Sequence, residues 1–215
     1  MSHIDVFDLD DTLIDSEIRF SEGVFAILDE EGIAYDAEEL KRLTIPMGLT
    51  GTAQYYRNVL GVRGSVDEIL ERIEKKMHKL YAERIAPKLD AVAYLNPLSR
   101  AGHRLFVLTA TPHSLADVCL KRHGLFSLFE RVWSVDDFGF PKSDVRLFEA
   151  VANTLGTAGR EIRYYDDSFT ALKNAKTVGF RTHAVCNHLL TRAQTKEYGQ
   201  FCDVIFRSFD ELPRP

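Results

Sequence analysis

The feature that most constrains the fold is an isolated apolar strand at the start of the chain. Ile4, Val6 and Phe7 form a short apolar run that ends at Asp8, and no convincing strand pattern follows between about 15 and 89. A single strand beside a group of helices would leave both of its edges unpaired. The first strand must therefore pair with strands that come much later. This predicts an α/β core that is interrupted early by a helical segment.

Within that segment the sequence carries helical patterns only. Apolar residues recur at helical spacing, and Gly32 provides a stop signal for the first helix. Ser65 and Glu68 have the spacing of a capping box, which predicts that a further helix begins there. Helices are expected over 16–31, 37–43, 52–60 and 65–80. We therefore interpret residues 15–89 as an all-helical insert.

From about Lys88 onward, strand patterns alternate with helix patterns. Strands are expected over 104–108, 131–134, 162–165, 182–185 and 204–206, and helices over 111–123, 144–155 and 170–178. Thr111 is the expected N-cap of the first of these helices, with Pro112 at its first position. Such alternation implies right-handed crossovers and a mostly parallel sheet with helices on both faces. The predicted fold is a Rossmann-like α/β core, residues 1–14 and 90–215, plus an inserted all-helical cap domain, residues 15–89.

The composition is that of an ordinary soluble globular protein, and it argues against several classes of partner. Of 215 residues, 45% are hydrophobic and 27% are charged, and a net charge of −5 offers no basic surface to nucleic acid or anionic membranes. No apolar run approaches the roughly 18 residues of a membrane span. The acidic start of the chain argues against a signal peptide. Three scattered cysteines favour reduced thiols, so we expect a cytoplasmic protein.

The side chains that carry chemistry follow the predicted strands. In open parallel sheets, ligands bind at the carboxyl ends of the strands. The residues found there, together with a lysine in a loop before a helix, are Asp8, Asp10, Thr109, Lys142, Asp166 and Asp167. Two carboxylates ~4 Å apart repel by roughly 4 kcal/mol at an effective dielectric near 20, and a divalent cation is the usual means of offsetting this. The set is suited to holding Mg²⁺ and a phosphoryl group together.

Each of these residues also has an ordinary structural explanation. Asp8 could belong to an acidic turn, and a threonine such as Thr109 after a strand is usually a cap. Lys142 alone would be a solvated surface lysine, and the acidic pair before Ser168 would be a turn with an N-cap. Their occurrence together, in this order along the chain, favours the catalytic interpretation.

The same segments resemble the four motifs of the haloacid dehalogenase superfamily, whose members are mostly magnesium-dependent phosphatases. The matching segments are Asp8-Leu9-Asp10-Asp11-Thr12, Phe106-Val107-Leu108-Thr109, Lys142 with Asp144 and Phe148, and Tyr165-Asp166-Asp167-Ser168 with Gly179. The helical insert is similar to the C1-type cap of the subclass that includes phosphoglycolate phosphatase and β-phosphoglucomutase. Many relatives have glycine where Asp11 stands and a further acid where Ala171 stands.

The resemblance implies a role for each site residue. Asp8 is implied to be the nucleophile and Asp10 the general acid and base, while Thr109 and Lys142 bind the phosphoryl group. The implied ligands of Mg²⁺ are Asp8, the backbone carbonyl of Asp10, Asp167 and, to a smaller extent, Asp166.

The resemblance extends to one loop of the cap. The segment that begins at Met47 resembles the cap loop that faces the substrate in the family. Thr50, Gln54 and Arg57 are therefore candidate substrate contacts, although exposed positions on a surface helix explain each of them equally well.

The predicted activity is that of a phosphoric monoester hydrolase acting on a small phosphorylated metabolite, as a monomer or weak homodimer. Candidate substrates are a sugar phosphate, phosphoglycolate or a nucleotide. A phosphomutase of the β-phosphoglucomutase kind uses the same aspartate pair and stays an alternative. A dehalogenase would not need Asp10, and a phosphonatase would need a Schiff-base lysine from the cap. A phospho-accepting signalling module combines similar groups, but its motif order and shorter chain do not fit.

Overall fold

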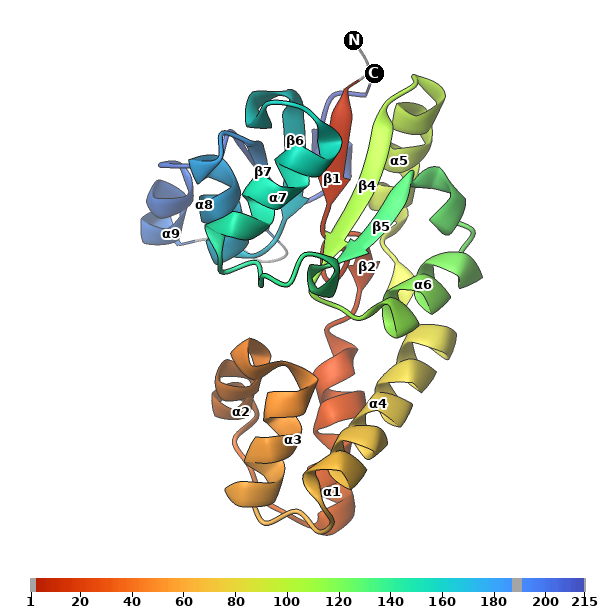
Figure 1. The fold of residues 1–215 in the computed structure, drawn as a ribbon, viewed down its shortest axis with the longest axis vertical. Helices are drawn as coiled ribbons and strands as arrows, with labels where there is room; N and C mark the ends of the chain where they lie inside the picture. Colours follow the sequence, from red (N-terminus) through yellow and green to blue (C-terminus); the bar gives the residue numbers. More distant parts are fainter. Residues whose placement is uncertain (1–2, 187–190, 215) are drawn as a thin grey trace. The chain divides into compact units, whose positions relative to one another are not determined.

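The computed structural model describes residues 3–186 and 191–214. The chain divides into two compact units (Figure 1). The core unit consists of Met1–Asp15 and Ala86–Pro215, and the helical unit consists of Ser16–Ile85. Throughout the described ranges, each helix is too short or too polar to cross a membrane.

The core unit is built on a six-stranded parallel sheet. Its strands are β1 (Ile4–Phe7), β4 (Arg104–Thr109), β5 (Arg131–Ser134), β6 (Ile162–Asp166), β7 (Arg181–Val185) and β8 (Val204–Phe206). They lie in the order β5-β4-β1-β6-β7-β8, so the first strand of the chain is at the centre of the sheet. Ile4 pairs with Arg104 on one side and with Ile162 on the other. The predicted parallel α/β sheet is confirmed.

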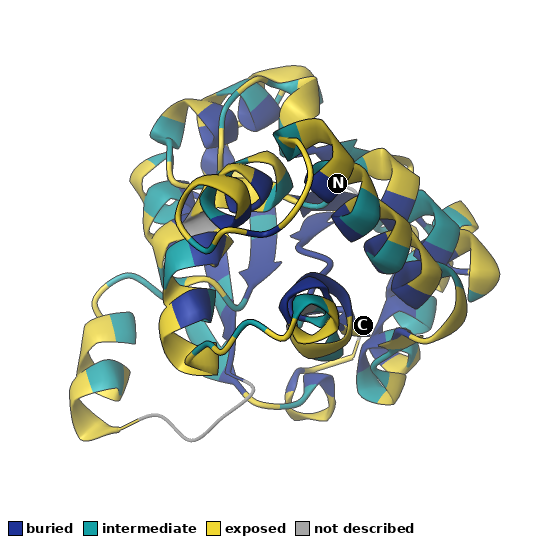
Figure 2. Cartoon of the chain, turned by 90° about the horizontal axis from the view of Figure 1, so that it is seen from below, coloured by how far each residue is buried: buried dark blue, intermediate teal, exposed yellow. Residues whose placement is uncertain are grey.

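Helices cover both faces of this sheet (Figure 1). They are α5 (Leu89–Arg100), α6 (His113–Arg122), α7 (Val145–Leu155) and α8 (Phe169–Thr177), while α9 (Arg192–Tyr198) has no buried residue. Val6 belongs to the same buried cluster as Phe148 of α7 and Leu172 of α8. On the opposite face Tyr165 stacks on Phe7, and its hydroxyl lies 3.2 Å from that of Tyr94 in α5. Figure 2 shows the strands as buried and the outer helical faces as exposed, as expected for a parallel sheet covered on both sides.

A buried ionic network lies on the second of these faces. Asp5 of β1 is fully buried and accepts hydrogen bonds from Arg163 Nη2 (2.7 Å) and the Tyr165 hydroxyl (3.1 Å). Arg163 Nε also lies 2.6 Å from the Asp5 carboxylate as an ion pair, without hydrogen-bond geometry. His103 Nδ1 is 2.8 Å from the same carboxylate. The network connects β1, β6 and the residue that precedes β4 around one buried charge.

Two very short strands lie where the chain leaves and re-enters the core unit. β2 (Ile14–Asp15) pairs antiparallel with β3 (Ala86–Pro87). The sequence was expected to be purely helical between about 15 and 89, so this pair is a correction. Two residues are too few to display the alternation by which a strand is identified.

The helical unit contains four α-helices within its described residues. They are α1 (Ala26–Glu31), α2 (Ala37–Thr44), α3 (Gly48–Asn58) and α4 (Val66–Glu83), with a π-helical turn over Phe20–Val24 and a 3₁₀ turn over Ile45–Met47. The single helix expected over 16–31 is therefore broken. A Cβ atom on Gly23 would lie 2.5 Å from Met77 Sδ, so this glycine allows the π-helical turn to approach α4 closely. The predicted stop at Gly32 is confirmed, since Gly32 adopts a left-handed conformation with φ of 66°.

The predicted capping box at the start of α4 is also confirmed. The Ser65 hydroxyl accepts a hydrogen bond from the Glu68 backbone N–H (3.2 Å), and Glu68 Oε2 accepts one from the Ser65 N–H (2.7 Å). Two backbone donors at the helix end are thus satisfied reciprocally. The expected apolar face is buried along Ile69, Ile73, Met77 and Leu80.

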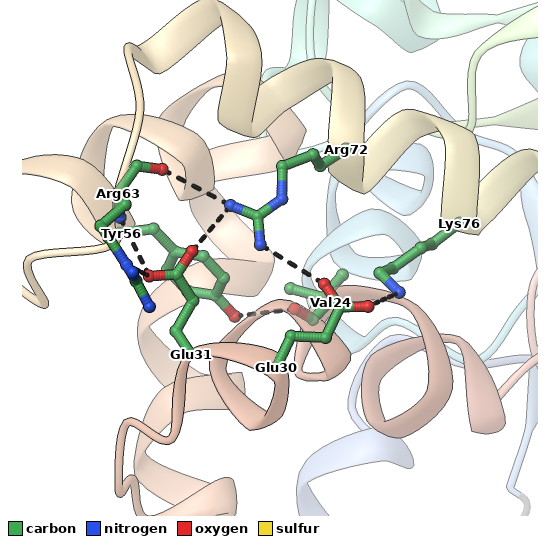
Figure 3. Close-up of polar contacts among 7 residues, drawn as sticks. All are labelled: Val24, Glu30, Glu31, Tyr56, Arg63, Arg72 and Lys76. Atoms are coloured by element: carbon green, nitrogen blue, oxygen red, sulfur yellow. Dashed lines mark hydrogen bonds and ion pairs between the residues drawn. The ribbon is translucent and has the colours of Figure 1, made fainter.

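A network of charged side chains connects α1, the loop before α4, and α4 itself (Figure 3). Arg72 donates to Glu31 Oε1 (3.0 Å), to Glu30 Oε2 (3.3 Å) and to the Arg63 carbonyl (3.4 Å). Glu31 also accepts from the backbone and side chain of Arg63. Hydrogen bonds from Lys76 lower the pKa of Glu30, and those from Arg63 lower the pKa of Glu31.

Replacing Arg72 with methionine is expected to lower the thermal unfolding temperature by a few degrees. The substitution removes contacts to two carboxylates and one carbonyl at once, whereas an isolated surface pair would contribute little. Lys75→Met, on the same helix, is the matched control. The difference between Arg72→Met and wild type should shrink as the pH falls below the ordinary glutamate range, because the lowered pKa values stabilise the fold only while the carboxylates are ionised. An undiminished difference at low pH would contradict an ionic origin.

Candidate active site

Asp8 lies at the carboxyl end of the central strand. Its backbone N–H donates to the Tyr165 carbonyl (2.8 Å), which extends the pairing of β1 with β6 by one residue. The residue is only 5% exposed. Its Oδ1 atom accepts a hydrogen bond from Lys142 Nζ. The sheet thus presents the Asp8 carboxylate to a buried ammonium group.

Lys142 reaches the site from the loop before α7. Its Nζ atom donates to Asp8 and to Asp166 Oδ2 (2.8 Å), and its side chain is 13% exposed. Asn174 Nδ2 donates to the Lys142 carbonyl (3.0 Å) and fixes the loop. Burial alone would lower the pKa of Lys142, but the charges of Asp166 and Asp8 outweigh it and raise this pKa. Lys142 is therefore not a solvated surface lysine but a buried cation shared by two acids.

The two acids at the end of β6, Asp166 and Asp167, differ in burial and in their contacts. Asp166 is fully buried, and its carboxylate accepts from the Ser168 N–H (2.6 Å), the Tyr164 hydroxyl and Lys142. Asp167 is half-buried, and one oxygen from each of Asp8, Asp166 and Asp167 lies within 4.8 Å of the others. Donors of the protein thus hold Asp166 in place, while Asp167 stands beside Asp8.

The charges of this cluster fit a divalent cation. Burial raises the pKa of Asp8 well above its ordinary value; Lys142 acts in the opposite direction, and Asp166, Asp167 and Asp10 raise the pKa further. Lys142 is shared by Asp8 and Asp166, and Asp167 brings a third carboxylate to within 4.8 Å of theirs. Carboxylate oxygens at this spacing are the ligands that Mg²⁺ prefers. The residues present therefore fit the metal that the sequence predicted.

Asp10 is connected to the end of β4 through a threonine that the sequence analysis assigned differently. Thr109 is buried at the end of β4, and its hydroxyl accepts from the Thr111 N–H (3.0 Å). The Thr111 hydroxyl donates to Asp10 Oδ2. Thr111 is therefore not the N-cap of α6, which begins at His113 with Pro112 in the cap position.

Thr111 is a site residue that the sequence analysis missed. A threonine followed by a proline is typical of a helix start, and the sequence analysis therefore assigned Thr111 as an N-cap. The sequence offers one signal, a second hydroxyl two residues after the threonine that ends the strand. In the structure the chain bends at residues 110 and 111, and the Thr111 hydroxyl contacts Asp10.

The loop after β1 has an unusual backbone. Asp11 adopts a left-handed conformation with φ of 57°, the one non-glycine residue with positive φ in the described chain. The Leu9 carbonyl accepts from the N–H groups of Leu13 (2.9 Å) and Ile14 (3.1 Å), which closes the loop. Glycine adopts this conformation without cost, and aspartate tolerates it better than most residues. Glycine at this position would therefore remove the conformational cost.

The core unit therefore brings the predicted core residues together in two groups. Asp8, Lys142, Asp166 and Asp167 form one contiguous cluster, and Thr111 links Asp10 to Thr109. Thr50, Gln54 and Arg57 lie on α3 of the helical unit, and their contact with substrate stays a prediction.

Comparison with known proteins agrees with this architecture. Residues 6–185 match the family described as haloacid dehalogenase-like hydrolase. The chain is 37% identical over 93 residues to the GMP/IMP nucleotidase YrfG of Escherichia coli (strain K12), covering 43% of this chain and 41% of that protein. It is 23% identical over 215 residues to the validoxylamine A 7'-phosphate phosphatase of Streptomyces hygroscopicus subsp. limoneus, covering 100% and 98% respectively.

A solved structure shows the same fold. A variant of CbbY from Rhodobacter sphaeroides, in complex with xylulose-(1,5)bisphosphate, superposes with a TM-score of 0.80 at 22% identity, covering 99% of this chain and 96% of that one. The family match runs from β1 through β7 and includes every predicted core site residue. The resemblance inferred from the four motifs is confirmed: the chain belongs to the haloacid dehalogenase-like hydrolases.

Proposed function

We propose that this hydrolase is a magnesium-dependent phosphatase that acts on a small phosphomonoester through an aspartyl-phosphate on Asp8. The observation that carries the proposal is the buried Asp8 carboxylate, which contacts the Lys142 ammonium and stands beside Asp167. A carboxylate nucleophile must approach an anionic ester, so positive charge has to be in place before the reaction begins. Lys142 supplies part of that charge.

Asp8, the backbone carbonyl of Asp10 and Asp167 would hold Mg²⁺. When bound, the ion would screen the repulsion between the nucleophile and the phosphate oxygens. Asp166 is already engaged by Lys142, Tyr164 and Ser168, so we assign it chiefly to fixing Lys142. Thr109 and Lys142 would bind the phosphoryl oxygens.

Asp10 is assigned the proton transfers. In the first step the Asp8 carboxylate forms a bond to phosphorus, the ester P–O bond breaks, and Asp10 donates its proton to the leaving oxygen. In the second step Asp10 takes a proton from the water that attacks the aspartyl-phosphate, which regenerates Asp8 and releases phosphate. The hydrogen bond from Thr111 keeps the Asp10 carboxylate oriented for both transfers.

We further propose that residues 15–89 act as the substrate-selecting cap and that the substrate is a small phosphorylated metabolite. The names of two relatives, a GMP/IMP nucleotidase and a validoxylamine A 7'-phosphate phosphatase, support small phosphate esters as the substrate class. We propose a cytoplasmic monomer or weak homodimer.

The proposal is tested by phosphate release from an aryl phosphate and a panel of metabolite phosphates, with and without Mg²⁺. Turnover that depends on Mg²⁺ is expected. A phosphomutase would instead convert a sugar phosphate into its isomer with little net release. Failure to release phosphate from any ester in the panel would overturn the phosphatase assignment.

Replacing Asp167 with asparagine is expected to raise the Mg²⁺ concentration for half-maximal activity by about 100-fold or more, since even residues that only orient a metal ligand contribute 10–100-fold. Asp136→Asn, an exposed aspartate of the same unit, is the control. Activity titrated against Mg²⁺ provides the measurement. An unchanged Mg²⁺ requirement, or full activity in excess chelator, would show that Asp167 holds no essential metal.

A further inference from the structure

Lys88 contacts the catalytic loop through both its backbone and its side chain. Its N–H donates to the Leu13 carbonyl (2.9 Å), and its Nζ atom donates to the Asp11 carbonyl. Lys88 follows β3 directly and is separated from Asp11 by 77 positions in the sequence. Two carbonyls of the loop that carries Asp10 are therefore bound by one residue from a distant part of the core unit.

We propose that Lys88 is a positioning residue that aims the Asp10 carboxylate at the leaving oxygen. The proposal rests on the acid role of Asp10 proposed above. The Asp10 side chain is fixed by Thr111, whereas its backbone belongs to a loop whose next residue adopts a left-handed conformation. That conformation is unfavourable for a residue with a Cβ atom, although aspartate tolerates it better than most residues. The loop therefore needs contacts that hold it.

The chemistry of Lys88 suits this task. A hydrogen bond from an ammonium to a carbonyl is charge-assisted and roughly twice as strong as a neutral one. The ammonium also brings positive charge to a loop that carries Asp8, Asp10 and Asp11 within four positions. The hydrogen bonds from Lys88 to the loop described above end on backbone carbonyls, those of Leu13 and Asp11, so these contacts hold the loop itself.

The expected result of losing this contact depends on the leaving group. An aryl phosphate such as p-nitrophenyl phosphate has a leaving oxygen that departs without a proton, whereas an alkyl phosphate needs Asp10 to protonate it. Lys88→Met is expected to lower kcat/KM for alkyl phosphates about tenfold, less than the roughly 10²-fold that a 1 Å misplacement of a catalytic group can cost. The kcat/KM for p-nitrophenyl phosphate should be nearly unchanged. Lys88→Arg, which keeps the charge and donors, should restore most of the loss.

The measurement is the ratio of the two kcat/KM values, alkyl over aryl, for the full-length protein with Mg²⁺. The ratio does not depend on the fraction of enzyme that is correctly folded, so a merely destabilised variant leaves it unchanged. Lys173→Met, an exposed lysine of the core unit, is the control and should match wild type. Asp10→Asn is the reference and should lower the ratio by about 10²–10⁴-fold.

Two results would overturn the inference. If Asp10→Asn lowers the ratio and Lys88→Met does not, Lys88 does not position the acid, and the proposed function stands. If Asp10→Asn itself leaves the ratio unchanged, the acid role of Asp10 fails and the positioning role fails with it.

Discussion

Asp8→Asn is expected to reduce phosphate release by a factor on the order of 10⁴–10⁶, the loss seen when a catalytic nucleophile is removed. An amide has no anionic oxygen to attack phosphorus, while its size and its acceptor for Lys142 are preserved. Steady-state phosphate release with the aryl phosphate measures the effect, and Asp136→Asn again serves as the control. Near-normal turnover by Asp8→Asn would eliminate the aspartyl-phosphate mechanism.

The same substitution is expected to leave the stability of the metal-free protein unchanged or to increase it. Burial and the neighbouring acids raise the pKa of Asp8, which means that the folded state disfavours its ionised form. Asparagine removes that penalty, as is common where a site is built for activity rather than stability. Thermal unfolding in chelator provides the measurement. A marked loss of stability would show that the ion pair with Lys142 outweighs the repulsion.

Asp5→Asn is expected to have the largest effect on stability. It removes the carboxylate that compensates the Arg163 guanidinium, whose side chain is 23% exposed. Leaving one partner of a buried ion pair uncompensated costs about 3–5 kcal/mol, which corresponds to a fall of roughly 10 °C in Tm for a chain of this size. Denaturant or thermal unfolding would measure it.

The double variant Asp5→Asn with Arg163→Met separates charge from packing. Removing both partners should recover part of the loss, because no uncompensated charge then remains. The catalytic rate of the folded fraction should stay near that of wild type, since the Asp5 network lies beside His103, near the beginning of β4, while the site lies at the carboxyl ends of the strands. Equal or greater loss in the double variant would show that Asp5 acts through packing alone.

The strands and the main acids were predictable because the physical signals for them are local. β1 and β6 were predicted from apolar runs that end in acidic residues. For β5 and β8, the predicted first and last residues are those of the structure. α5 escaped prediction because it contains Pro97, which the helix tolerates. α9 also went unpredicted.

Within the site, the roles of Thr111 and Lys88 could not be predicted from the local sequence. Their roles depend on contacts with residues that are far away in the sequence, and the residue type alone suggests a cap for one and a surface charge for the other. Lys142 was predicted from its place in a loop just before a helix, in combination with the acids and Thr109, and from its match to a motif of the family; alone it would have been taken for a surface lysine. Its two acidic partners, which decide its environment, become visible only in the fold.

The central place of β1 also determines the order in which the protein can fold during synthesis. Among the strands of the core unit β1 is made first, yet its partners span Arg104–Thr109 and Ile162–Asp166, so one edge of β1 stays unpaired until β4 has been made and the other until β6 has been made. The helical unit is one contiguous segment, so its helices can pack together as soon as that segment has been made. Folding of the core is thus dominated by long-range pairing, which is intrinsically slow. Meanwhile the nascent strand contains Asp5 and is followed by Asp8 and Asp10, and charges placed in this way oppose association of exposed strands. Asp8 and Asp10, which belong to the candidate active site, are therefore also expected to oppose aggregation of β1 before its partner strands have been made.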